Sequence, residues 1–170
     1  MKQWNVEHEL RVNQAGEYGA RRIYEGQLSI LKKHPEIKHM LQQELEHLNY
    51  FNQQLQNRKI RPTMLQPLWH VGGYMLGKVT AMMGEKAAMA CTVAVEEVIG
   101  AHYQKQLDLL QKEEIQEVEL GDKIRQFCAE EMEHRDHGLA KGAERAAGYG
   151  LLKMVISGIT KAAISLSKRI

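Results

Sequence analysis

Apolar residues recur with a period near 3.6 along most of this chain, and runs of β-branched residues are few, a pattern typical of amphipathic helices. Prolines at positions 35, 62 and 67 mark the main breaks in that pattern. The segment 57–67 is the one long connector, and it separates two helical hairpins. The sequence therefore predicts an all-α four-helix bundle with two additional helices. The predicted helices cover residues 8–33, 35–58, 68–84, 86–111, 113–147 and 150–168.

Glutamate and histidine interrupt the apolar stripe of the second predicted helix. At about 100° per residue, Glu44 and His47 share a face with the apolar residues Ile37, Met40, Leu41, Leu48, Phe51 and Leu55. By the same count, Glu131 and His134 lie on the apolar face of the 113–147 helix, with Leu120, Ile124, Phe127 and Cys128. Two inward Glu-x-x-His pairs on separate helices indicate a site that the helices share.

Two further glutamates point inward by the same test. Glu17 aligns with apolar residues of the first helix and Glu96 with those of the fourth, whereas the neighbouring Glu97 faces outward. Glu36 and His39 also form a Glu-x-x-His pair, but they project about 80° and 140° away from Glu44. We expect that third pair to be solvated.

Four acids facing one core require compensation, because a lone buried carboxylate costs several kcal/mol or becomes neutral. Two divalent cations would balance four negative charges, and four carboxylates with two imidazoles suit iron or manganese. Glutamates from two helices and Glu-x-x-His pairs from two others form the known arrangement of di-iron carboxylate bundles. A single buried Glu-His pair is more often a structural hydrogen bond, but two pairs with two lone acids favour metal. The candidate ligands are Glu17, Glu44, His47, Glu96, Glu131 and His134.

The two halves of the chain share a faint repeat. Two helices carry the series Glu, Tyr, Gln and Leu at identical offsets of 7, 10 and 11 residues from the Glu, and each precedes a Glu-x-x-His helix. The matching sets are Glu17, Tyr24, Gln27 and Leu28, and Glu96, Tyr103, Gln106 and Leu107. Either the chain contains two copies of one plan or the match is coincidental.

Composition excludes several classes of function. The 170 residues fit a single domain over 1–170. The 23 basic and 21 acidic residues give a net charge of +2 and are dispersed, so nucleic acid is not an expected partner. Cys91 and Cys128 lie in apolar helical surroundings and fit a reducing compartment rather than a disulfide framework. The charged N-terminus lacks the features of a secretory signal or a transit peptide.

Four stretches of the sequence resemble the demethoxyubiquinone hydroxylases, a di-iron monooxygenase family of ubiquinone biosynthesis. They are RVNQAGEYGARRIYEGQL, ELEHLNYFNQQL, ACTVAVEEVIGAHYQKQL and CAEEMEHRDHGL, and the similarity runs nearly end to end, including the tail KAAISLSKRI. The resemblance implies a ferritin-like fold with two iron ions at the same six candidate positions. We expect Glu44 and Glu131 to bridge the metals and the other four candidates to bind one metal each.

The resemblance also implies the reaction. One oxygen atom of O2 would enter the ring of a polyprenylated benzoquinone that lacks one methoxy group, the other would leave as water, and NADH or another reductant would supply electrons. In that family, a His-Tyr pair at the position of His102 and Tyr103 is assigned to electron or proton delivery, although here both could be structural. Gln14 stands where the family usually has His, and Cys128 where Arg is common; neither position is a candidate ligand.

A polyprenyl quinone dissolves in lipid, so the protein must reach a membrane surface. Residues 67–84 carry one formal charge, Lys78, and no stretch has the roughly 18 uninterrupted apolar residues of a membrane span. An interfacial helix or hairpin with Trp69 and Tyr74 near the head groups is expected instead. The amphipathic tail 150–170 has cations that suit anionic lipid: Lys153, Lys161, Lys168 and Arg169. Ordinary packing or a homo-oligomer contact remains the alternative for both segments.

The implied location is the cytoplasmic face of a bacterial inner membrane, or the matrix face of the mitochondrial inner membrane if the chain is a processed one. Other proteins of ubiquinone biosynthesis are further implied partners. Two rival functions remain: an iron-storing or peroxide-consuming relative on the same bundle, and a metal-free bundle that binds a prenyl lipid or a protein. The absence of a rubredoxin-like cysteine set and the apolar 67–84 segment argue against the first. Metal analysis of the purified protein tests the second.

Overall fold

The computed structural model describes residues 5–112 and 115–169. Within these ranges it contains six α-helices, one short 3-10 helix and no strands, which confirms the predicted all-α class. The elements are α1 (Val6–Ile30), α2 (Pro35–Asn57), α3 (Gln66–Met82), α4 (Glu85–Lys112), α5 (Val118–Ala140), η1 (Ala143–Arg145) and α6 (Tyr149–Ser167).

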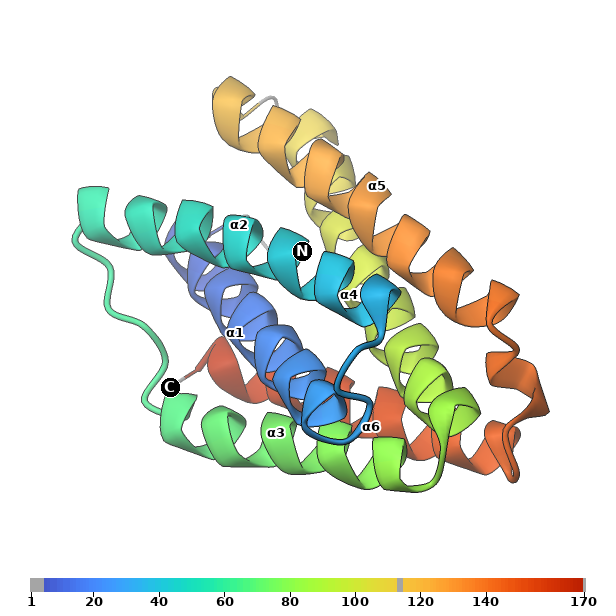
Figure 1. Ribbon diagram of the computed structural model, residues 1–170. Coiled ribbons are helices and arrows are strands. Elements are labelled where there is room, and N and C mark those ends of the chain that lie inside the picture. The colour runs from blue at the N-terminus through green and yellow to red at the C-terminus, as the bar shows by residue number, and fades with distance from the viewer. Residues whose placement is uncertain (1–4, 113–114, 170) are drawn as a thin grey trace.

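The helices form three layers. Helices α1 and α4 lie in the middle, with α2 and α5 on one side and α3 and α6 on the other (Figure 1). Helix α1 packs on α2 and α3, and α4 packs on α5 and α6. The expected ferritin-like bundle is therefore made by α1, α2, α4 and α5, and each half of the chain adds one further helix, α3 on α1 and α6 on α4.

Local sequence signals set several helix ends. Asn5 caps α1, since its side chain accepts a hydrogen bond from the His8 amide at 3.1 Å. Helix α1 ends at Ile30 rather than at residue 33, and Pro35 begins α2. His34 is extended, as expected for a residue before proline.

The helix predicted for residues 113–147 is the main correction. Its expected start at 113 lies outside the described residues, and α5 begins at Val118. The helix ends at Ala140, because Gly142 adopts a left-handed φ of 82° that turns the chain into η1. Ala143 and Ala146 are buried beyond this turn, so the apolar pattern continues where the helix does not.

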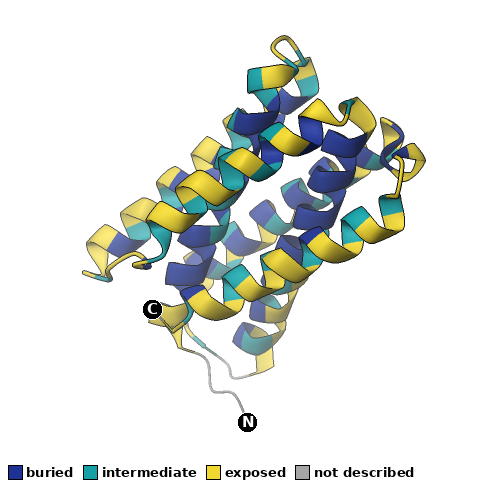
Figure 2. Cartoon of the chain, turned by 90° about the horizontal axis from the view of Figure 1, so that it is seen from below, coloured by how far each residue is buried: buried dark blue, intermediate teal, exposed yellow. Residues whose placement is uncertain are grey.

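Buried positions line the inner faces of the helices, and α3 and α6 are the most exposed (Figure 2). The predicted inward face of α2 is buried, except for the half-buried Leu41. Helix α3 approaches α1 closely through glycines. A Cβ at Gly77 would lie 1.9 Å from the Ile23 carbonyl oxygen, and one at Gly26 would lie 2.1 Å from the Tyr74 carbonyl oxygen. Only glycine permits this backbone contact.

Candidate metal centre

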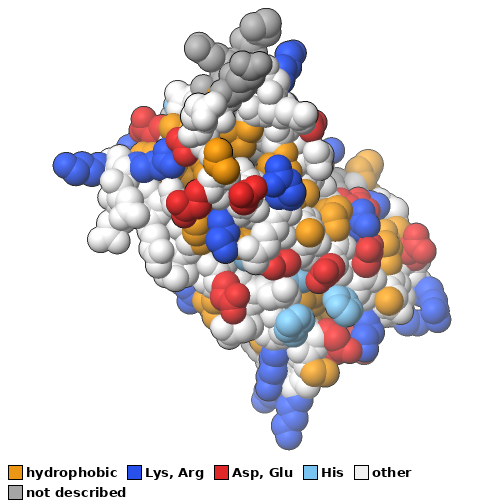
Figure 3. Space-filling model, turned by 90° about the horizontal axis from the view of Figure 1, so that it is seen from above, with side chains coloured by type: hydrophobic (Ala, Val, Ile, Leu, Met, Phe, Trp, Pro, Cys, Tyr) orange, Lys and Arg blue, Asp and Glu red, His pale blue; other side chains and the backbone are white. Residues whose placement is uncertain are grey.

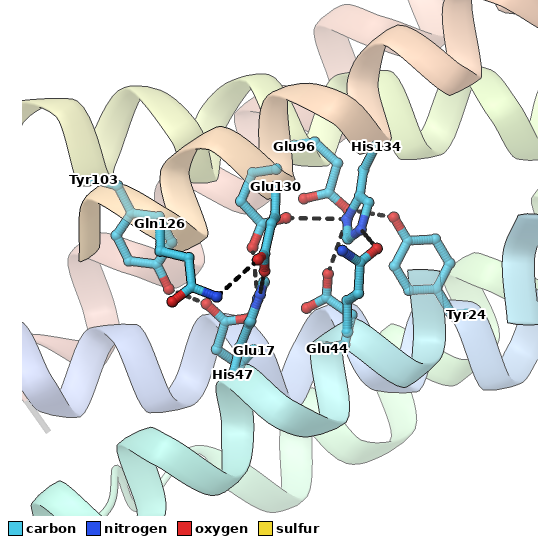
Figure 4. A network of polar contacts seen from close by, with 11 residues as sticks. Glu17, Tyr24, Glu44, His47, Glu96, Tyr103, Gln126, Glu130 and His134 are labelled. Carbon is cyan, nitrogen blue, oxygen red and sulfur yellow. Dashed lines mark hydrogen bonds and ion pairs between the residues drawn. The ribbon is translucent and has the colours of Figure 1, made fainter. Parts of the chain in front are cut away.

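All six side chains predicted to face inward converge in the middle of the bundle, and Figure 4 labels all of them except Glu131. Each is at most 1% exposed. They come from four helices: α1 contributes Glu17, α2 contributes Glu44 and His47, α4 contributes Glu96, and α5 contributes Glu131 and His134.

The six residues form two overlapping groups in which the potential ligand atoms all lie within 4.8 Å of one another. One group adds Glu17 and His47 to a shared pair of glutamates, and the other adds Glu96 and His134. The shared pair is Glu44 and Glu131, which are the residues expected to bridge. The arrangement has room for one cation in each group.

Both imidazoles turn Nδ1 toward the acids. His47 Nδ1 lies 3.1 Å from Glu131 Oε1 and 3.4 Å from Glu17 Oε2. His134 Nδ1 lies 3.2 Å from Glu131 Oε2 and 3.2 Å from Glu44 Oε1. The two oxygens of Glu131 therefore serve different groups.

Unpaired polar atoms test whether metal ions fit this centre. Six atoms of the cluster are buried without a hydrogen-bond partner, although buried polar atoms are normally paired. They are Glu17 Oε2, both carboxylate oxygens of Glu44, Glu96 Oε2, Glu131 Oε2 and His134 Nδ1. Oxygen and imidazole donors left open toward one another are what a hard divalent cation requires, so the residues fit two such ions.

The cluster strongly perturbs its own acidities. Burial raises the pKa of Glu17, Glu44 and Glu96, and the charge of Glu131 raises them further. Burial opposes the charged form of Glu131 too, but the attraction of the His134 and His47 rings outweighs it and lowers that pKa. Burial likewise lowers the pKa of His134, yet the attraction of the Glu131 and Glu44 carboxylates, each with an oxygen 3.2 Å from Nδ1, raises the pKa to about 11. The carboxyl groups with raised pKa values are therefore stabilised by a bound proton or by a nearby cation.

Two tyrosines hold the lone glutamates across the halves. Tyr24 of α1 donates a hydrogen bond to Glu96 Oε1, and Tyr103 of α4 donates one to Glu17 Oε1. Burial and the Glu96 charge raise the pKa of Tyr24 well above its usual value, so its hydroxyl keeps the proton that it donates. The offset repeat in the sequence contains both tyrosines, although the sequence predicts a functional role only for Tyr103.

Two further contacts were not predicted. Glu130 of α5 binds His47 Nε2, and Gln43 Oε1 of α2 lies 3.0 Å from His134 Nε2. Each directly precedes a shared glutamate in the sequence, which is the one signal that could have found them.

His102 does not turn toward the cluster. Its Nε2 lies 2.7 Å from Gln106 Nε2 and 3.4 Å from Glu9 Oε2, in a separate polar network between α1 and α4. Burial lowers the pKa of His102 to about 4, so the ring is neutral near pH 7. Of the expected His-Tyr pair, the structure places only Tyr103 against a candidate ligand.

The outward residues behave as the facing argument requires. His39 is exposed, and Glu36 pairs with Lys141 on the surface. Glu97 pairs with Lys153 of α6 at 2.8 Å. The Glu36/His39 pair is thus separate from the buried cluster.

The fold and the cluster together define the class: a ferritin-like helical bundle with a candidate dinuclear metal centre. The family model described as "Ubiquinone biosynthesis protein COQ7" matches residues 5–167, and the chain belongs to this family. This confirms the resemblance read from the sequence.

Named relatives extend from bacteria to mammals. A "3-demethoxyubiquinol 3-hydroxylase" of Rhodospirillum rubrum is 47% identical over 169 residues, which cover 97% of this chain and 78% of the relative. A "NADPH-dependent 3-demethoxyubiquinone 3-hydroxylase, mitochondrial" of Mus musculus is 48% identical over 168 residues, covering 96% and 77%. A "5-demethoxyubiquinone hydroxylase, mitochondrial" of Saccharomyces cerevisiae is 38% identical, covering 95% and 76%.

Proposed function

We propose that this chain acts as one domain, a di-iron monooxygenase that hydroxylates the ring of a polyprenylated demethoxybenzoquinone in ubiquinone biosynthesis. The observation that carries the proposal is the pair of overlapping Glu/His groups buried in the bundle. The names of the relatives supply the reaction class and the substrate.

Two iron ions held by the six residues would supply the activation of O2. In the overall reaction, one oxygen atom replaces a ring hydrogen as a hydroxyl group, and the other leaves as water with two protons and two electrons from a reductant. The relatives' names point to NADPH as the donor, whereas the sequence had suggested NADH or another reductant.

The protein's own contribution is to hold the ligands in a dry, fixed arrangement. All six are nearly inaccessible to water, which strengthens their interaction with a cation. Tyr24 and Tyr103 each fix one oxygen of a lone glutamate and leave the other oxygen free. Tyr103 thus has a positioning role next to Glu17, and we propose no proton transfer through His102.

An apolar cavity between α1, α3, α4 and α6 is the proposed entrance for the quinone. Gly16 and Val95 line it, and they directly precede Glu17 and Glu96 in the sequence. Its other walls come from α3, including Trp69 and Leu76, and from α6. Trp69 donates a hydrogen bond to Ser167 at 3.1 Å and joins α3 to the end of α6.

The outer faces of α3 and α6 would contact the membrane and so bring the cavity close to the lipid. Both expose large apolar side chains: Leu68, Val71, Met75, Val79 and Met82 on α3, and Leu151, Met154, Val155, Ile159 and Leu166 on α6. Helix α6 is long and apolar enough to cross a membrane by length and composition, and 11% of its apolar window is buried. Lys153 and Ser157 of α6 donate hydrogen bonds to α4, so one side of α6 is held against the bundle. We therefore propose that α6 lies in the membrane–water interface and does not span the membrane.

We accordingly place the protein peripherally on the cytoplasmic face of a bacterial inner membrane or on the matrix face of the mitochondrial one. The mitochondrial names of several relatives support the second setting for those proteins. Other proteins of ubiquinone biosynthesis and a second copy of the chain are further proposed partners.

One experiment separates the proposal from its rivals. Iron-loaded protein is supplied with a reductant, a lipid-dispersed demethoxyquinone and isotopically labelled O2, and the product is analysed by mass spectrometry. One labelled oxygen atom in the quinone ring is the expected result. A mineral iron core with unchanged quinone would favour the iron-storing rival, and fewer than one tightly held metal ion per chain would favour the metal-free one.

A further inference from the structure

The two inward histidines are held from behind by side chains of different charge. Glu130 of α5 binds His47 Nε2, whereas Gln43 of α2 binds His134 Nε2. A carboxylate or amide oxygen can only accept a hydrogen bond, so each ring donates from Nε2 and presents Nδ1 to the acids. Gln43 and Glu130 stand at equivalent positions of the two halves, each directly before a shared glutamate.

Glu130 is itself held in place. Gln126, one turn earlier on α5, donates to Glu130 Oε1 at 2.9 Å and leaves Oε2 for His47. The Phe127 ring lies against the ring of His47, with a centroid distance of 4.0 Å. The side chain of Glu130 is 23% exposed and that of His47 is 1% exposed. A fixed carboxylate at the rim thus orients a buried imidazole.

The two groups have several contacts in common. Each lone glutamate receives one tyrosine hydroxyl, from Tyr24 or Tyr103, and each group shares Glu44 and Glu131. Two differences between the metal positions are the Phe127 ring against His47 and the side chain that binds Nε2 of each imidazole. Of these two, only the second changes the charge near a metal position.

We infer that Glu130 makes the two metal positions unequal, so that the ion beside His47 and Glu17 binds more tightly and has a lower reduction potential than the ion beside His134 and Glu96. A carboxylate behind a ligating histidine raises the basicity of the ring, and hydrogen bonds to charged acceptors are the stronger ones. An amide in the same place orients the ring without adding charge. The inference rests on the proposed dinuclear site.

The test exchanges these two side chains. Wild type, Glu130→Gln, Gln43→Glu and the double exchange are titrated with ferrous iron under anaerobic conditions, and half-loaded samples are examined by Mössbauer spectroscopy. We expect two binding steps of unequal affinity in the wild type. Glu130→Gln should weaken the tighter step by roughly 10-fold and raise the potential of one iron only. Gln43→Glu should tighten the weaker step by a similar factor.

The double exchange distinguishes tuning from loss of structure. It should restore two unequal steps, with the first iron now showing the spectrum of the other position, whereas a variant that merely misfolds would lose both ions. Equal weakening of both steps by Glu130→Gln, or no change in either, would overturn the inference while leaving the proposed function intact. A wild type that fails to bind two ions would overturn both.

Discussion

At the scale of single residues, the lone glutamates have one oxygen held and one oxygen open. The Tyr103 hydroxyl occupies Glu17 Oε1, and the Tyr24 hydroxyl occupies Glu96 Oε1, while Oε2 of each is buried and unpaired. A group left this way costs free energy unless something binds it. The open oxygens therefore destabilise the metal-free protein, and a bound cation would remove this destabilisation.

Truncating a shared acid tests this arrangement directly. Glu44→Ala and Glu131→Ala should each reduce bound iron from two ions to one or none, because both groups depend on the shared pair, and turnover should be lost. Metal analysis after gel filtration measures the stoichiometry. Glu36→Ala and His39→Ala are the matched controls, since this pair has the same spacing but lies outside the cluster. Loss of iron in the Glu36 variant would contradict the facing argument.

The pH dependence of stability should reverse sign with metal. In chelated protein, the raised pKa of Glu17, Glu44 and Glu96 and of His134 means that the folded state holds extra protons. Stability from a raised pKa is complete below the unfolded value and is lost as pH rises through the folded value. The lowered pKa of Glu131 gives a pH dependence of the opposite sign, but this is the effect of one group against that of several.

Chelated protein should therefore lose thermal stability between about pH 5 and pH 8. Cations replace the protons and bind better as pH rises, so the iron-loaded protein should gain stability over the same range. Thermal unfolding followed by circular dichroism, with and without chelator, measures both slopes. Parallel slopes would show that the cluster does not exchange protons for metal.

Helical periodicity was sufficient to predict the six inward residues, because burial on one face depends only on the angle around a single helix. The residues that bind Nε2 of the two histidines could not be predicted in that way. Gln43 and Glu130 reach across from one Glu-x-x-His helix to the other, so their role depends on how α2 and α5 approach one another. His102 illustrates the same limit, since its neighbours on α1 decide where it turns.

At the scale of the elements, the contact between α1 and α3 depends on glycine. Gly77→Ala would place a methyl group against the Ile23 carbonyl oxygen and should destabilise the protein by about 1–3 kcal/mol through overpacking. Gly158→Ala is the control, because its Cβ would meet nothing within 4 Å on exposed α6. That change should be neutral or stabilising by up to about 1 kcal/mol. Chemical denaturation measures both, and equal effects would argue against the close packing.

The helices themselves were predictable, but some of their ends were not. Pro35 and the cap Asn5 act locally, so the start of α2 is readable from the sequence and α1 begins within a few residues of its predicted start. The break after Ala140 was missed although Gly142 is a common helix-ending residue. The buried Ala143 and Ala146 beyond the turn continue the apolar pattern, and periodicity alone cannot distinguish one long helix from a helix and a turn.

At the scale of the whole molecule, the three layers give two unlike faces. The face over α2 and α5 mixes acidic and basic side chains (Figure 3), and the buried Glu/His cluster lies beneath it. The face over α3 and α6 is rich in exposed apolar residues, and the apolar cavity lies behind it. This division suits the proposed approach of a lipid substrate from the apolar side, with the charged side in water.

This polarity predicts binding to lipid vesicles through one face only. Val71 of α3 and Met154 of α6 are 61% and 64% exposed, and burying such side chains in lipid contributes about 1.5–3 kcal/mol each at full burial. The double variant Val71→Asp/Met154→Asp should weaken partition into vesicles containing anionic lipid by at least about 10-fold.

Val118→Asp is the control, since this residue is 71% exposed but lies on α5. Co-sedimentation measures the binding, with unchanged iron content as the check on folding. Equal losses in both variants would mean that the protein meets the vesicle through no particular face, whereas an unaffected double variant would assign the apolar surface of α3 and α6 to something other than lipid.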